Sequence, residues 1–284
     1  MSAQASGSPA AACSPRRVGL IAHSTLREAA RQKLFHALLL LAFGLVLGAG
    51  WFRDFNFGAP ELVFLADCGF GATSLFGSVL AVTATAQLFF SEIESRTVLT
   101  LLAKPVGRTE FILGKFLGLA VVLLVFCALL TVLLIGVLWS RETVLMQEFP
   151  EAFGSGRRVD YAMVALAGTL QWLKLMVLSS LTLLVASFAR TQMFTVIAGF
   201  SLLVICHLQP LAQESHARGG SVAGRLIGGL VAPVFPNFQI FTLADSIGAE
   251  PPAAGDVMRV VIYALGYTAV ACLLAGYSFR RREL

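Results

Sequence analysis

Residues 116–139 read FLGLAVVLLVFCALLTVLLIGVLW, an apolar stretch without a single charged side chain. A helix that crosses roughly 30 Å of hydrocarbon needs about 20 residues of this kind. The whole chain of 284 residues shares this character, since 57% are hydrophobic, 13% are charged and the mean hydropathy is +0.81. A soluble domain has about 25% charged residues. These values exclude a free soluble domain and a disordered chain, and they indicate a membrane protein.

Five more segments around this stretch are long and apolar enough to span a bilayer. They are residues 34–52, 69–90, 162–189, 192–210 and 257–279. Together the six segments predict an all-α polytopic membrane protein with six transmembrane helices, formed as a single domain by residues 16–284. Residues 1–15 are small, polar and proline-containing, and we expect a disordered tail there.

The distribution of Lys and Arg predicts the orientation, because these residues concentrate on the cytoplasmic side of the spans. One side of the predicted topology holds Arg16, Arg17, Arg27, Arg31, Lys33, Arg96, Lys104, Arg108, Lys115, Arg190, Arg280, Arg281 and Arg282. The other side holds only Arg53, Arg141, Arg157, Arg158, Arg218, Arg225 and Arg259. Both termini therefore belong in the cytoplasm. The basic residues behind the net charge of +5 orient the helices by their uneven distribution. They are no evidence for nucleic-acid binding.

The segments between the spans also carry patterns. Residues 16–33 place apolar side chains at helical spacing, with Arg27, Arg31 and Lys33 elsewhere, which predicts an amphipathic helix on the inner leaflet. Residues 140–160 are expected to form an outer loop. Prolines interrupt the apolar residues 225–243, which favours a re-entrant or interfacial segment before the last helix.

Catalytic motifs are absent from the sequence. The nearest approach to a phosphate-binding Walker A loop is Gly107 to Gly114-Lys115-Phe116, where the glycine spacing is wrong and Phe116 replaces the required hydroxyl. The five cysteines and four histidines show no metal-ligand spacing. We therefore expect no catalytic residue, no metal and no cofactor in this chain.

Polar residues inside the spans offer a few candidates for a functional site. Lys174 is the one clear charge within the predicted spans, and either it snorkels to the interface or it faces a cavity or partner. Ser74, Ser78 and Thr85 lie on the second span, where hydroxyl and small residues either make helix contacts or line a translocation path. The lack of carboxylates within the spans argues against a proton relay.

The stretch between the second and third spans is the most informative. Ile93, Thr97 and Leu101 share a face at helical spacing, and Ser91 is placed to cap a new helix, with Glu94 at the capping-box position. Pro105 ends the pattern. Residues 92–104 therefore predict a short amphipathic helix that either caps the bundle or docks into a cytoplasmic partner.

Residues 92–115 resemble the loop after the second helix in permease subunits of ABC-2 type transporters. The shared pattern runs from Glu92-x-Glu94-x-Arg96-Thr97 through Leu101-Leu102-Ala103-Lys104-Pro105 to Arg108, Glu110 and Gly114-Lys115. It is most similar to the branch that includes permeases linked to multicopper-enzyme maturation, and residues 25–35 also resemble that branch. Many members carry Gly directly before the threonine, where this chain has Arg96.

This resemblance implies a permease of an exporter in the bacterial inner membrane, which pairs with a second permease that is either an identical copy or a paralogue. It also implies a separate nucleotide-binding subunit, which binds ATP and Mg²⁺. The 92–104 helix would be the coupling helix seated in that subunit. The residues implied in coupling are Glu92, Glu94, Arg96, Thr97, Leu101, Lys104, Pro105 and Arg108.

Two other classes of function compete with this interpretation. A stand-alone secondary carrier or channel would need no ATPase, but its usual intramembrane carboxylates are missing. A lipid-modifying membrane enzyme would need a polar cluster near an interface, for which His207 and Asp245 are the candidates; no catalytic spacing joins them.

Overall fold

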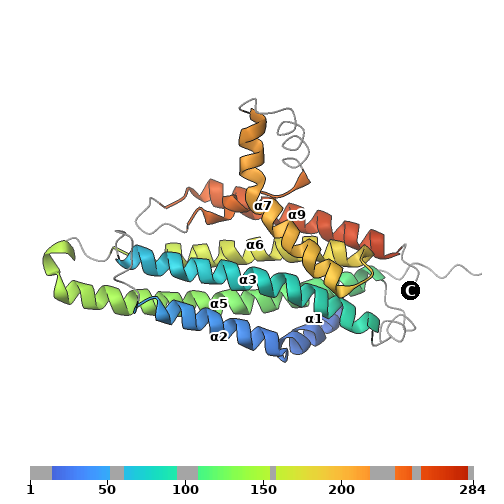
Figure 1. The fold of residues 1–284 in the computed structure, drawn as a ribbon, viewed down its shortest axis with the longest axis horizontal. Coiled ribbons are helices and arrows are strands. Elements are labelled where there is room, and N and C mark those ends of the chain that lie inside the picture. The colour runs from blue at the N-terminus through green and yellow to red at the C-terminus, as the bar shows by residue number, and fades with distance from the viewer. Residues whose placement is uncertain are drawn as a thin grey trace, which may run out of the picture.

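The computed structural model describes residues 15–51, 61–94, 108–153, 158–217, 234–244 and 251–280 (Figure 1). Every regular element within these ranges is helical. The elements are α1 (Pro15–Ala30), α2 (Lys33–Gly48), α3 (Glu61–Glu94), α5 (Arg108–Glu148), η2 (Pro150–Phe153), α6 (Tyr161–Phe188), α7 (Gln192–Ala217), η3 (Phe238–Thr242) and α9 (Ala254–Arg280). The predicted tail lies outside the described residues except for Pro15, where α1 begins.

Five of these helices are long and apolar enough to cross a membrane, namely α3, α5, α6, α7 and α9. They confirm five of the six predicted spans. The first predicted span is shorter than expected, because α2 ends at Gly48 and has only 16 residues, or a length of about 24 Å. Gly48 and Gly50 favour helix termination there. A sixth candidate span exists if α1 and α2, which meet at an angle of 64°, are counted together.

The long helices alternate in direction along the bundle. The phenyl ring of Phe279, near the end of α9, lies 5.7 Å from that of Phe89 in α3 and 5.9 Å from that of Phe111 in α5. At the other end, the side chain of Arg141 in α5 pairs with Glu61 at the start of α3, with 2.6 Å between Nη2 and Oε1. We call the end that holds Phe279 the α1 end, since α1 contacts the start of α5 there, and the other the distal end.

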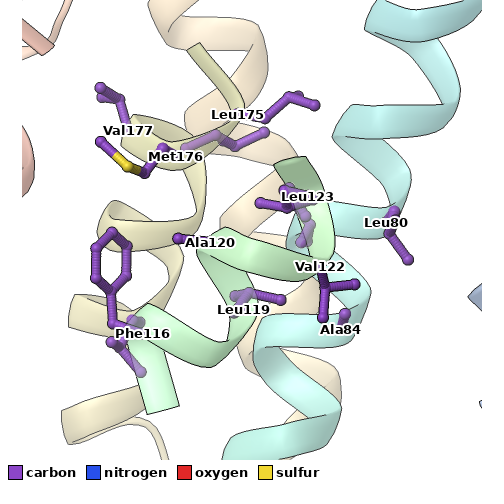
Figure 2. Close-up of a cluster of buried hydrophobic side chains, with 14 of the residues drawn as sticks. Leu80, Ala84, Phe116, Leu119, Ala120, Val122, Leu123, Leu175, Met176 and Val177 are labelled. Carbon is purple, nitrogen blue, oxygen red and sulfur yellow. The ribbon is translucent and has the colours of Figure 1, made fainter. Parts of the chain in front are cut away.

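Helix α6 forms the centre of the bundle. Of its most apolar stretch, 72% is buried, compared with 22% for α7 and 28% for α9. It packs against α3, α5, α7, α9 and η3, and the side chains that meet there from α3, α5 and α6 are drawn in Figure 2. A Cβ added to Gly77 of α3 would lie 2.5 Å from Cδ1 of Leu175. The fit of α3 on α6 thus depends on a missing side chain, as is common for helices packed in lipid.

The distal segment 140–160 is not the loop that the sequence predicts. Helix α5 continues to Glu148 and is followed by η2, because residues 140–148 contain no glycine or proline and Pro150 is the first residue able to stop the helix. With 41 residues, α5 extends about 62 Å, twice the thickness of a hydrocarbon core. The helix is therefore longer than a membrane span requires, with extra turns on both sides of its apolar run.

The segment before the last helix is irregular where it is described. Of the predicted re-entrant or interfacial residues 225–243, those from 234 on are described; residues 235–237, which include Pro236, lie outside any helix, and residues 238–242 form the short helix η3. Phe238 and Phe241 of η3 are buried, and the backbone N–H of Asn237 donates to the hydroxyl of Tyr263 in α9. Irregular backbone of this kind is tolerated in a membrane protein where protein covers it.

Helix α1 does more than lie on a membrane surface. Its predicted apolar face contains Thr25 and Ala29, which are almost fully buried, and α5 covers that face. A Cβ on Gly118 of α5 would lie 2.6 Å from Cβ of Thr25 and 2.7 Å from the carbonyl oxygen of Ala22. Gly114, one turn earlier, would meet Ile21 in the same way. Helix α5 therefore covers this face of α1, and the position of α1 on the inner leaflet stays a prediction.

Substituting Gly118 with Ala should loosen this contact. We expect a loss of about 1–3 kcal/mol in the free energy of unfolding, because the new methyl group overlaps the backbone of α1 and not merely a flexible side chain. The measurement is unfolding in detergent micelles. The matched control is Gly136→Ala on the same helix, where no atom lies within 4 Å of an added Cβ. Equal stability of the two variants would contradict the packing described.

Candidate coupling surface and intramembrane groove

Most of the residues implied in coupling fall on a segment that the structure does not describe. Arg96, Thr97, Leu101, Lys104 and Pro105 lie outside the described residues. Glu92 and Glu94 belong to the last turn of α3, and Arg108 is the first residue of α5. The prediction that Ser91 begins a separate helix is wrong, because α3 continues without a break to Glu94. Phe89 and Phe90, just before Ser91, are buried within the bundle.

The helix ends that flank this segment are tied together by a polar junction at the α1 end. The hydroxyl of Ser91 in α3 donates to Oε1 of Glu28 in α1 over 3.1 Å. The ammonium of Lys115 in α5 donates to Oε2 of the same carboxylate over 3.4 Å. The side chain of Lys115 is 3% exposed and that of Glu28 is 41% exposed. One carboxylate thus joins three helices.

Sequence reasoning did not pair these three residues, although all of them lie in or beside the stretches that resemble ABC-2 permeases. The sequence feature that could have indicated the junction is Lys115, a charged residue among apolar ones near the start of α5. It lies beside Gly114 and Gly118, which leave room for α1. The phenyl rings of Phe89, Phe111 and Phe279 pack beside the junction and connect α9 to α3 and α5. A force applied to residues 95–107 would therefore reach α1, α3, α5 and α9 together.

The basic residues predicted for the membrane interface remain accessible. Arg27, on α1, and Arg31, in the link to α2, are exposed, and so is Lys33 at the start of α2. Since α5 covers the apolar face of α1, these cations extend from a helix that is already docked. They are placed to meet lipid headgroups or a partner at the α1 end.

A second polar cluster lies in the middle of the bundle, around Lys174 of α6. This side chain is 3% exposed, and its ammonium donates to the hydroxyl of Ser74 in α3 over 2.9 Å. The same nitrogen lies 5.9 Å from the centre of the Phe238 ring of η3, a distance at which a cation is attracted to an aromatic face. Lys174 therefore does not snorkel to the interface; it is directed into the bundle.

A groove with a volume of about 530 Å³ runs between α3 and α7 beside this cluster. It is lined by Gly71, Ser74, Leu75, Ser78 and Val79 of α3 and by Phe200, Leu203, Val204, His207 and Leu208 of α7. His207 is half-buried, and its ring packs edge-on against Phe238 with 5.5 Å between centres. The sequence suggests His207 only as part of a polar cluster near an interface, because it does not show that η3 folds back onto this residue.

The predicted intramembrane residues separate into two groups. Ser74, Ser78 and Lys174 come together, since Ser78 and Ser74 line the groove and the hydroxyl of Ser78 donates to the carbonyl of Ser74 over 2.6 Å. Thr85 lies closer to the α1 end, where its hydroxyl donates to the Ala81 carbonyl and its side chain lies beside Lys115. Thr85 therefore belongs to the helix packing near the junction and not to the groove.

Comparison with known proteins adds one match. A family model described as ABC-2 family transporter protein matches residues 20–284, nearly the full length of the chain. No curated protein matches the chain at a significant level. The match concerns the family as a whole, and the narrower branch suggested by residues 92–115 stays a prediction.

A double-mutant cycle tests the junction. Because Glu28 is partly exposed, we expect a coupling energy of about 1 kcal/mol between Glu28→Gln and Lys115→Met in the free energy of unfolding in micelles. The exposed pair Asp256–Arg259 in α9, with 3.2 Å between Oδ1 and Nη1, is the control and should show weaker coupling. Strictly additive effects of the Glu28 and Lys115 substitutions would show that the carboxylate does not join α1 to α5.

Proposed function

The chain belongs to the ABC-2 family of transporter proteins, and from this membership we propose that a separate nucleotide-binding subunit drives its helices by binding and hydrolysing ATP. The chain is a multi-pass membrane protein of the permease type. Such permeases are typically the non-catalytic part of the transporter. ATP and Mg²⁺ would therefore be held by the partner and not by this chain.

The polar junction at the α1 end is the observation that best supports this proposal. Residues 95–107 connect α3 to α5, and the ends of both helices are tied to α1 through Glu28 and to α9 through Phe279. A partner that pushes on this connection would move several helices as one body. Transport would then occur as the helix bundle switches between an inward-facing and an outward-facing arrangement. This switch requires no reactive side chain in the permease.

We propose further that the α1 end faces the cytoplasm of a bacterial cell and that the transporter works as an exporter. The Lys and Arg pattern supports this orientation, and the exposed Arg27, Arg31 and Lys33 fit an anionic inner leaflet. We also propose a second permease copy. In support, α7 and α9 keep most of their apolar side chains uncovered by the rest of the chain, so they are available to a second helix bundle as well as to lipid.

The coupling assignment can be tested by reversing charge next to the α3 end. In a pull-down from membranes that also contain a co-expressed ABC nucleotide-binding subunit that associates with the unaltered chain, Glu94→Arg with Arg96→Glu should reduce recovery of that subunit at least tenfold. The reason is that docked polar contacts become like-charge contacts.

The control is the same exchange at the distal end, Asp256→Arg with Arg259→Asp, which keeps the net charge and alters an exposed ion pair of α9. It should leave recovery unchanged. If the Glu94 and Arg96 reversal retains full association while the protein stays folded, the segment after α3 is not the docking element.

A further inference from the structure

We propose that the groove between α3 and α7 binds an anionic amphiphile, with the acidic headgroup at Ser74 and Lys174 and the apolar chain along the helices. This inference rests on the proposed transport function, because it names the class of cargo. It is carried by the juxtaposition of a buried ammonium, a hydroxyl that this ammonium polarises and an apolar groove of about 530 Å³. That volume lies in the range of small-molecule sites.

The charge at the end of the groove comes from Lys174. A lysine placed in mid-membrane costs about 2.5–3.5 kcal/mol on insertion scales, and such residues face the interior or a cavity in membrane proteins. Lys174 is buried by protein, and the Ser74 hydroxyl that accepts its hydrogen bond lies on the groove wall. The ammonium therefore lies one hydrogen bond from the groove wall, close enough to favour an anion over a cation there.

Ser74 carries this charge to the groove surface. A serine hydroxyl has one proton to donate and two lone pairs to accept with, and Lys174 uses one of the lone pairs. Ser78 bonds to the backbone carbonyl of Ser74 and not to its hydroxyl. Among the described residues, no acceptor for the Ser74 proton is found, so this O–H can donate into the groove. Donation from Lys174 strengthens the hydroxyl as a donor.

The opposite wall offers a second polar atom. Nδ1 of His207 lies 3.0 Å from the carbonyl oxygen of Leu203, and a carbonyl can only accept, so the proton of a neutral ring is on Nδ1. Nε2 then remains for a proton on an acidic headgroup. The other lining side chains, including Leu75, Val79, Val204 and Leu208, are aliphatic. Beside them a free inorganic ion would lose its hydration without gaining hydrogen bonds in return, whereas an acyl chain would make favourable apolar contacts.

The test is binding to the purified chain alone, in discs of zwitterionic lipid. The probes are a fluorescent single-chain amphiphile with a phosphate headgroup, the same chain with a phosphocholine headgroup, and inorganic phosphate. We expect at least tenfold tighter binding of the phosphate-headed amphiphile than of the choline-headed one, and no competition by inorganic phosphate at equal concentration.

Lys174→Met and Ser74→Ala should each abolish the headgroup preference, and Lys174→Arg should retain part of it. Ser201→Ala is the matched control, since the Ser201 hydroxyl on α7 is exposed and bonds to the Ile197 carbonyl outside the groove. If the Lys174→Met variant does not fold, the headgroup preference of the Ser74→Ala variant tests the proposal. Equal affinity for both headgroups, an unchanged preference in the folded variants, or full competition by inorganic phosphate would overturn the proposal.

Failure here can be told apart from failure of the proposed transport function, because the binding assay contains no ATPase. Headgroup-selective binding without ATP-driven movement of the probe in vesicles would leave the site intact and refute transport. ATP-driven transport by a complex whose permease shows no headgroup preference would refute the site alone.

Discussion

The close packing of other helices on α6 is the constraint on which the rest of the structure depends. Lipid supplies no hydrophobic force between helices, so they must associate through fitted surfaces and small residues. A Cβ on Gly168 of α6 would lie 2.2 Å from the Thr131 hydroxyl of α5, and one on Gly199 of α7 would lie 2.7 Å from Val82 of α3. These glycines allow α6 to lie close to α5, and α7 to lie close to α3.

This packing also connects the two polar regions. Helix α3 carries both Ser91, at the junction with Glu28, and Ser74, at the groove. The two serines are 17 positions apart on one unbroken helix, which corresponds to about 25 Å. A displacement of the α1 end would therefore be passed along α3 to the groove as movement of a rigid rod. Helix α7, the least buried of the spanning helices, forms the groove's other wall and is the part that is freest to move in response.

The sequence predicts well what depends on composition and period. Long apolar runs predict the five spanning helices, and the spacing of Thr25 and Ala29 predicts the buried face of α1. The spacing of apolar residues in α1 does not reveal which helix covers that face. Gly114 and Gly118 of α5 leave the room for α1, and this is visible only when the two helices lie side by side. Likewise, α5 passes through a segment predicted as loop, since helix formers continue the helix beyond the end of the apolar run.

The candidate sites show the same division. The sequence singles out Lys174 and Ser74 as polar residues in spans, but it does not reveal that they bond to each other or that η3 brings Phe238 over the ammonium. These contacts join residues far apart in the chain, so no local pattern records them. The assignment of residues 92–104 to coupling is of another kind, because it rests on a resemblance, and most of those residues lie outside the described part of the chain.

If ATP on a separate subunit drives this chain, its binding should move α3 against α7. The most direct measurement is the distance between spin labels at Leu75 and Val204, which are exposed on opposite walls of the groove, in a variant without native cysteines. We expect ATP and Mg²⁺ to change this distance when the nucleotide-binding subunit is present and to leave it unchanged in the isolated chain. An unchanged distance in the assembled, ATP-hydrolysing complex would contradict this expectation.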